Sequence, residues 1–134
     1  MNQELHKLIE FAADATSRIF TSQGGKWLGM YHGLQQNGSE CLIPVKGEPQ
    51  DEIRAAFHKL SIVRYLLIDR VTIFSDDKPM EAIVFIAEDD SGFLSGYRKI
   101  QSETTLGPLE YHLANSDLKS RLVGLMPTES QTRH

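Results

Sequence analysis

RYLLIDRVTIF (Arg64–Phe74) decides the fold, together with MEAIVFIAE (Met80–Glu88), which follows it after a short turn. Both segments are rich in β-branched and aromatic residues, and both are apolar on the two faces that an extended chain presents. This pattern predicts two inner strands, because only strands covered on both faces are apolar on both. Turn residues at 89–92 lead to a third predicted strand over 93–101. The sequence therefore predicts an antiparallel meander.

A β-hairpin is predicted upstream of the meander. Asn37-Gly38 is the strongest turn signal in the chain, and it predicts a type I′ turn because both residues tolerate the left-handed conformation. The predicted strands run over 26–35 and 39–46. Pro44 cannot donate a ladder hydrogen bond, so the second strand is expected at the sheet edge with its nitrogen facing outward.

Two amphipathic helices are predicted, over 3–20 and 51–62, from apolar residues spaced three and four apart. The fold class is α+β, with an about five-stranded, mainly antiparallel sheet and two main helices. The element order is α-β-β-α-β-β-β plus a short C-terminal segment. Residues 1–127 are expected to form one domain and 128–134 a flexible polar tail. Roadblock/longin-like and profilin-like domains, which are interaction modules, share this order, a likeness of element order alone.

Composition predicts a globular protein outside the membrane. The chain has 134 residues with a formal charge of -4, which disfavours a dedicated nucleic-acid binder that needs a basic face. Its apolar runs are too short to span a bilayer, and the start of the chain does not resemble a signal peptide. Because Cys41 is the single cysteine, no internal disulfide can form. These features predict a cytoplasmic protein.

The second half of the chain resembles a family of small uncharacterised bacterial α+β proteins. The resemblance rests on 63–69, on a strand around 81–89, on Leu-Gly-Pro-Leu-Glu at 106–110 and on Arg-Leu-Val-Gly-Leu-Met-Pro at 121–127. Arg70 and Thr72 depart from the family pattern, in which an acidic residue and a Trp are usual. The resemblance implies the fold and carries no activity, cofactor or catalytic residue.

Motif searches yield no catalytic, cofactor-binding or metal-binding residues, and no cofactor is predicted. Gly24-Gly25-Lys26 matches only the end of a phosphate loop, and no dinucleotide-binding glycine pattern occurs. The five histidines lack metal-ligand spacing. Cys41 lies on a predicted strand, where a free cysteine usually behaves as a small apolar residue. An enzyme is therefore the less favoured class.

Four residues are candidates for an interaction surface: Trp27, Tyr31, Tyr97 and Arg98. Trp27 and Tyr31 are predicted on one face of the first hairpin strand, either as an interface anchor or packed beneath the first helix. Arg98-Lys99 beside Tyr97 is the best local candidate for an anion or nucleic-acid contact, and an ordinary charged strand face is the favoured alternative. Lys99 follows Arg98 directly, so it is expected on the opposite face.

Three function classes follow. The first is a non-catalytic protein-interaction module, such as an adaptor, regulator or inhibitor of a bacterial or phage system, whose partner is another protein or a second copy in a homodimer. The alternative is a small-molecule or nucleotide-binding domain, with or without weak enzymatic activity, that uses Lys26, His32, Arg98 and Lys99. The third, a nucleic-acid-binding regulator, is disfavoured by the acidic balance.

Overall fold

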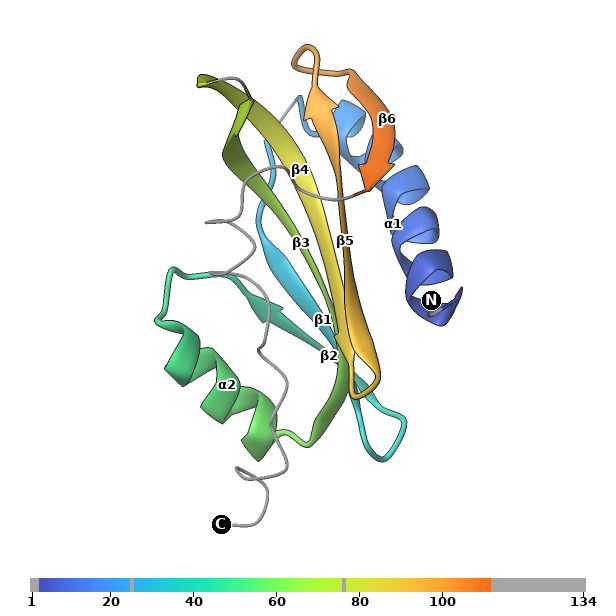
Figure 1. Cartoon of the computed structure of the whole chain (residues 1–134), viewed down its shortest axis with the longest axis vertical. Coiled ribbons are helices and arrows are strands. Elements are labelled where there is room, and N and C mark those ends of the chain that lie inside the picture. The colour runs from blue at the N-terminus through green and yellow to red at the C-terminus, as the bar shows by residue number, and fades with distance from the viewer. Residues whose placement is uncertain (1–2, 25, 76, 112–134) are drawn as a thin grey trace.

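The fold is a six-stranded antiparallel sheet with one helix on each face (Figure 1). The computed structural model describes residues 3–24, 26–75 and 77–111. Its elements are α1 (Gln3–Ser22), β1 (Met30–Gln35), β2 (Glu40–Pro44), α2 (Gln50–Lys59), β3 (Ile62–Ser75), β4 (Lys78–Asp89), β5 (Gly92–Ile100) and β6 (Leu106–Tyr111). The α+β class and the order α-β-β-α-β-β-β are confirmed. The sheet has one strand more than expected, because β6 pairs along β5.

The strands lie in the order β2-β1-β3-β4-β5-β6. The two segments that decide the fold, β3 and β4, occupy the centre, as their two-sided apolarity predicts. On β4, Ile83, Phe85 and Ala87 pack in the cluster under α1, while Ile86 packs in the cluster under α2. All four are fully buried. The sheet therefore supports a separate apolar core on each face.

α1 covers only one half of its face of the sheet. Its buried stripe packs mainly against β4, β5 and β6, and Figure 1 shows the helix running along the side of the sheet where β6 lies. The stripe consists of Leu5, Ile9, Ala12, Ala13, Thr16 and Phe20. The rest of this face is formed by β3, β1 and β2, where Leu66 and Ile68 of β3 are already buried in the cluster under α1, and the site described below lies here.

α2 lies on the opposite face, beside the β1–β2 hairpin, and buries Phe57 against Tyr31 and Tyr65. The helix ends at Lys59, three residues before the predicted end at residue 62. Ser61 has a φ of 56°, a left-handed conformation that cannot continue a helix, and Ile62 already begins β3.

The hairpin confirms the edge prediction and corrects the turn prediction. β2 is an edge strand. The Val45 N–H donates to the Gly29 carbonyl oxygen, and the Gln35 N–H donates to the Ser39 carbonyl oxygen. The backbone N–H and C=O groups of the odd-numbered residues along β2 therefore point toward β1. Since pairing alternates along an antiparallel strand, Pro44 faces outward. The predicted type I′ turn is wrong, because Gly38 has positive φ and Asn37 does not. The loop instead has three residues and ends in a left-handed glycine.

The remaining sequence predictions fall outside the described residues. They are the short C-terminal segment, the domain boundary at residue 127 and the tail at 128–134. Across the part of the chain that the structure describes, neither helix has the length and apolarity that a bilayer crossing requires.

Candidate functional site

An apolar groove lies beside α1, over β3, β1 and β2. Its volume is about 330 Å³. One wall is α1, the floor is formed by β1 and β3, and the rim on the far side is the edge strand β2. The apolar side chains that line it are Leu8, Phe11, Ala12, Ala15, Ile19, Trp27, Leu34, Leu42, Leu66 and Ile68. The groove therefore has the composition expected of a binding cleft rather than of a solvated surface.

The α1 wall is a second apolar stripe on the same helix. Leu8, Phe11, Ala15 and Ile19 recur at spacings of three and four, so they lie along one side of the helix. The Phe11 side chain is 76% exposed and Ile19 is 43% exposed. Because the Ala15 side chain is small, the middle of the α1 wall projects less than Phe11 and Ile19 on either side. This stripe lies beside the buried one, so α1 is apolar over a wider sector than its own sheet covers.

The floor and the far rim come from alternate residues of three adjacent strands. Register pairs His32 of β1 with Leu66 of β3 on one side and with Leu42 of β2 on the other, so these three side chains point to the same face. Leu66 is buried, whereas Leu42 is 63% exposed at the rim. Partial burial lowers the pKa of His32, an effect that nearby Glu40 opposes. The lowered pKa favours the neutral form of the imidazole.

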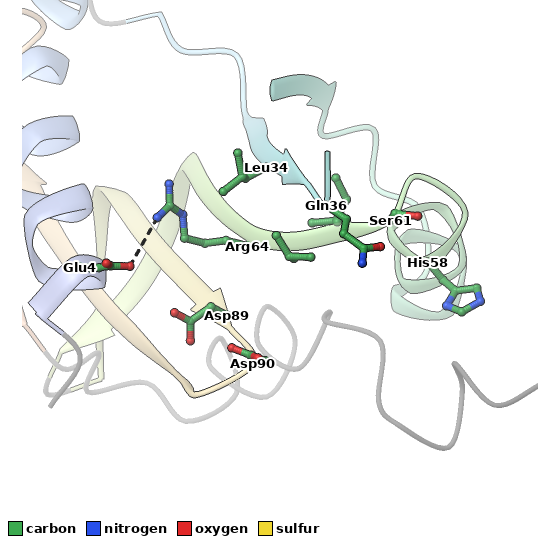
Figure 2. Close-up of a pocket in the computed structure, with 10 residues that line it drawn as sticks. Glu4, Leu34, Gln36, His58, Ser61, Arg64, Asp89 and Asp90 are labelled. Carbon is green, nitrogen blue, oxygen red and sulfur yellow. Dashed lines mark ion pairs between the residues drawn. The ribbon is translucent and has the colours of Figure 1, made fainter. Parts of the chain in front are cut away.

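The groove opens at one end into a shallow pocket of about 490 Å³ whose lining includes several charged side chains, and the two share Leu34 and Arg64. Figure 2 shows Arg64 pointing toward Glu4 of α1, with Asp89 and Asp90 at the nearby end of β4 and His58 extending away from them. The Arg64–Glu4 ion pair measures 4.0 Å. Three carboxylates and one guanidinium line this pocket, which makes this end of the groove acidic.

The acidic pocket is built from turn and helix residues rather than from a catalytic arrangement. One carboxylate oxygen of Asp89 accepts hydrogen bonds from the backbone N–H of Ser91 and Gly92 and from the Ser91 hydroxyl. Asp89 thus closes the β4–β5 turn. Within residues 3–24, 26–75 and 77–111, no three His, Cys, Asp or Glu side chains gather as ligands for a metal ion.

Two of the four predicted interaction residues lie on opposite faces. Tyr31 is 2% exposed and packs in the cluster under α2, whereas Trp27 packs beside α1 and lines the groove. The expected alternation fails because β1 begins only at Met30, after Trp27. Burial, with smaller effects from Asp69 and Glu48, raises the pKa of Tyr31 to about 12. Tyr31 is thus a core residue, and Trp27 keeps its place in the candidate site.

The other two predicted residues lie away from the groove. Tyr97 packs on the α2 face of the sheet against Ile73, Ala82 and Val84. Arg98 points to the α1 face and donates hydrogen bonds to the carbonyl oxygens of Gly107 and Ala13, each at 2.6 Å, and to the Ser17 hydroxyl. Burial lowers the pKa of Arg98, with Asp14 acting in the opposite direction. Arg98 therefore fastens α1 to β6.

The residues proposed for a small-molecule site are not brought together. His32 lines the groove, whereas Lys99 lies on the opposite face of the sheet and forms an ion pair with Glu110 at 3.9 Å. Lys26 is exposed in the segment before β1. Arg98 and His32 stand on β5 and β1, which β3 and β4 separate. These four side chains form no shared cluster.

The residues that sequence reasoning missed are Phe11 and Leu42. Phe11 falls outside the stripe that predicts the buried face of α1, and such a large apolar residue beside a complete stripe is a usable signal of a second contact surface. Leu42 lies on the predicted edge strand, where pairing places it on the same face as His32. The sequence shows the apolar periodicity of the helix, but it does not show which half of the sheet the helix covers.

Comparison of the chain with protein-family models, with curated proteins and with solved structures finds no match. The resemblance in the second half of the chain stays a prediction.

Proposed function

We propose that the protein is a non-catalytic interaction module that binds a protein partner through the groove between α1 and the β1–β2 hairpin. One observation carries this proposal: Phe11, Ile19 and Leu42 are large apolar side chains exposed around a single apolar groove. Isolated exposed apolar residues are common, but a contiguous set around a concave surface is typical of binding sites.

Burial of these exposed side chains would contribute enough free energy to support association. Burying one large apolar side chain contributes about 1.5–3 kcal/mol, so covering all three contributes on the order of 5 kcal/mol. This gain offsets part of the entropy lost on association. The floor residues Leu66 and Ile68 are already buried, so the gain comes from the rims.

Self-association through the same groove, in a homodimer, belongs to this proposal as one of two forms that the module can take. Sedimentation equilibrium of the wild type from low to high micromolar concentration measures it. Peptide display against the immobilised protein measures binding of other chains. The variants are Phe11→Glu in the groove and Phe74→Glu as the matched control, since Phe74 is a 54% exposed aromatic residue at the far end of β3.

Phe11→Glu is expected to weaken self-association or peptide binding at least about tenfold, because it places a carboxylate in an apolar contact. Phe74→Glu is expected to change neither. Equal behaviour of the two variants in both assays would remove the groove as the docking surface.

A small-molecule site is the second candidate function, and the groove volume favours it. A volume of about 330 Å³ lies within the usual range for ligand pockets, and His32, Glu40 and Arg64 offer a few polar contacts. Arg64 is the one Arg or Lys among the described groove-lining residues, which suits an apolar ligand better than a nucleotide. A thermal-shift screen with small molecules tests this second candidate, and the effect of a ligand of this site must disappear in Ala15→Trp.

A further inference from the structure

The strip of sheet beside α1 has the width of one α-helix. Adjacent strands lie about 4.8 Å apart, so β3, β1 and β2 together span about 10 Å. A helix with its side chains is about 10 Å across, and packed helices lie about 8–10 Å apart. α1 already occupies the neighbouring half, over β4 to β6. A second helix placed beside α1 would complete this layer of the fold.

The edge strand β2 is poorly suited to bind an extended peptide. The backbone groups that point away from β1 belong to Glu40, Leu42 and Pro44, since those of the odd-numbered residues bond to β1. Pro44 has no N–H, so only Glu40 and Leu42 offer outward donors. By contrast, a helix laid in the groove would contact the apolar side of α1 and the floor at once.

We propose that the groove binds one amphipathic helix of a partner protein. The basic side chains of that helix lie at the end of the groove where Glu4, Arg64, Asp89 and Asp90 line the pocket. This inference rests on the proposed function and names its partner. The α1 wall runs from Leu8 to Ile19, so the partner helix contacts it over about three turns. Its apolar residues recur at spacings of three and four, matching Phe11, Ala15 and Ile19.

Charge selects the basic end of the partner. Glu4, Asp89 and Asp90 outnumber Arg64 in the pocket that continues the groove (Figure 2). A Lys or Arg at that end of the partner helix meets a surface of opposite sign, which favours the correct orientation and speeds encounter. Acidic residues in the same place would be repelled. Binding is therefore expected to weaken as salt concentration rises.

Among the described residues, the exposed apolar helix face that a second copy offers is the α1 stripe of Leu8, Phe11, Ala15 and Ile19, and that stripe already forms a wall of the second copy's own groove. The buried stripe of α1 and Phe57 of α2 pack on the chain's own sheet. The outer side of α1 carries charged residues, including Asp14 and Arg18, which pair with each other at 3.5 Å. We therefore assign the docked helix to another protein.

The test uses a hydrocarbon-stapled amphipathic peptide of about 14 residues, with leucines at spacings of three and four and two lysines in one terminal turn. A second peptide has glutamates in place of the lysines, and a third, unstapled peptide carries a central proline, which prevents helix formation. Fluorescence anisotropy measures their affinities for the full chain. The groove variants are Phe11→Glu and Ala15→Trp, with Phe74→Glu as control. Asp90→Asn tests the acidic end, with Glu103→Gln as its control.

The lysine peptide is expected to bind about fivefold more tightly than the glutamate peptide. Asp90→Asn is expected to reduce that preference, whereas Glu103→Gln keeps it. Phe11→Glu and Ala15→Trp are each expected to weaken binding at least about tenfold, the second by filling the low centre of the wall. A photo-crosslinker at Leu42 is expected to capture the peptide.

Equal binding of the stapled and proline peptides would overturn the helix, and equal binding of the lysine and glutamate peptides would overturn the charge assignment. Crosslinks from Leu42 to a second copy, or to residues 112–134 of the same chain, would overturn the partner. In those cases the proposed function still stands if Phe11→Glu weakens self-association or peptide binding. If neither self-association nor any peptide responds to Phe11→Glu, both proposals fall.

Discussion

Replacing Arg98 with methionine should destabilise the fold by about 2–4 kcal/mol. The guanidinium is the main polar connection between α1 and the β5–β6 edge: it reaches Ala13 and Ser17 on the helix and Gly107 on β6. Every one of these acceptors is a neutral oxygen, and no carboxylate lies among them. Methionine preserves much of the side-chain volume and removes all of the donors.

The magnitude follows from the two short bonds to carbonyl oxygens, each at 2.6 Å. A hydrogen bond from a charged donor contributes about 1.5–3 kcal/mol, so the pair contributes about 3–6 kcal/mol. The guanidinium is half-buried, and the solvation that it regains in the unfolded chain reduces this figure to about 2–4 kcal/mol. Arg98→Lys should lose roughly half as much, because an ammonium lacks the planar fork that reaches both elements.

Urea unfolding followed by tryptophan fluorescence and far-ultraviolet circular dichroism measures the loss. The control is Lys99→Met on the opposite face, whose ion pair with Glu110 is half-exposed and should contribute less than about 1 kcal/mol. Hydrogen exchange adds a local readout, since β6 amides should lose protection first in Arg98→Met. A loss below about 1 kcal/mol, or one equal to that of Lys99→Met, would refute the assignment of Arg98 as the fastener.

Three further outcomes are expected. Trp27→Phe should keep the free energy of unfolding within about 1 kcal/mol of the wild type, because the buried indole N–H has no acceptor among the described residues and its removal ends that desolvation cost; a larger loss in urea unfolding would indicate a bond. Gly96→Val should destabilise by about 1–3 kcal/mol, since a Cβ there lies 3.0 Å from the Glu110 carbonyl oxygen of β6; unchanged β6 hydrogen exchange would contradict this. The free energy of unfolding should fall as pH drops below about 6.5, because burial lowers the folded-state pKa of His32 and the unfolded chain then binds more protons. His32→Gln should flatten that dependence between the folded-state pKa and 6.5, and an unchanged slope would exclude His32 as its source.

The central part of the fold was predictable because it rests on local pattern. Two-sided apolarity placed β3 and β4 at the centre, and Pro44 placed β2 at the edge. The wrong predictions fall where the backbone conformation of a single residue decides how an element or a turn ends. Ser61 adopts a left-handed conformation that ends α2 early, and Asn37 stays out of that conformation, so the turn has three residues. No periodicity reports such choices, because they depend on the strands that the turn must join.

The candidate site was less predictable, because it depends on how elements meet. Aromatic residues were favoured as contacts, yet Tyr31 is core and Tyr97 packs on the far face of the sheet. Arg98 was expected at the surface, and α1 and β6 enclose it instead. These outcomes require the strand order and the position of α1, and neither is encoded in a single strand. Trp27 is the predicted residue that does line the groove.

The apolar sector of α1 links the fold to the proposed function. A helix that served only its own sheet would need one stripe, and the residues from Leu5 to Phe20 provide it. Phe11 adds nothing to that core, since it is 76% exposed, and an exposed phenylalanine promotes unwanted association. Ala15 beside it keeps the wall low enough for another helix to approach. A folding requirement alone accounts for neither residue, whereas a helix docked over β3, β1 and β2 accounts for both.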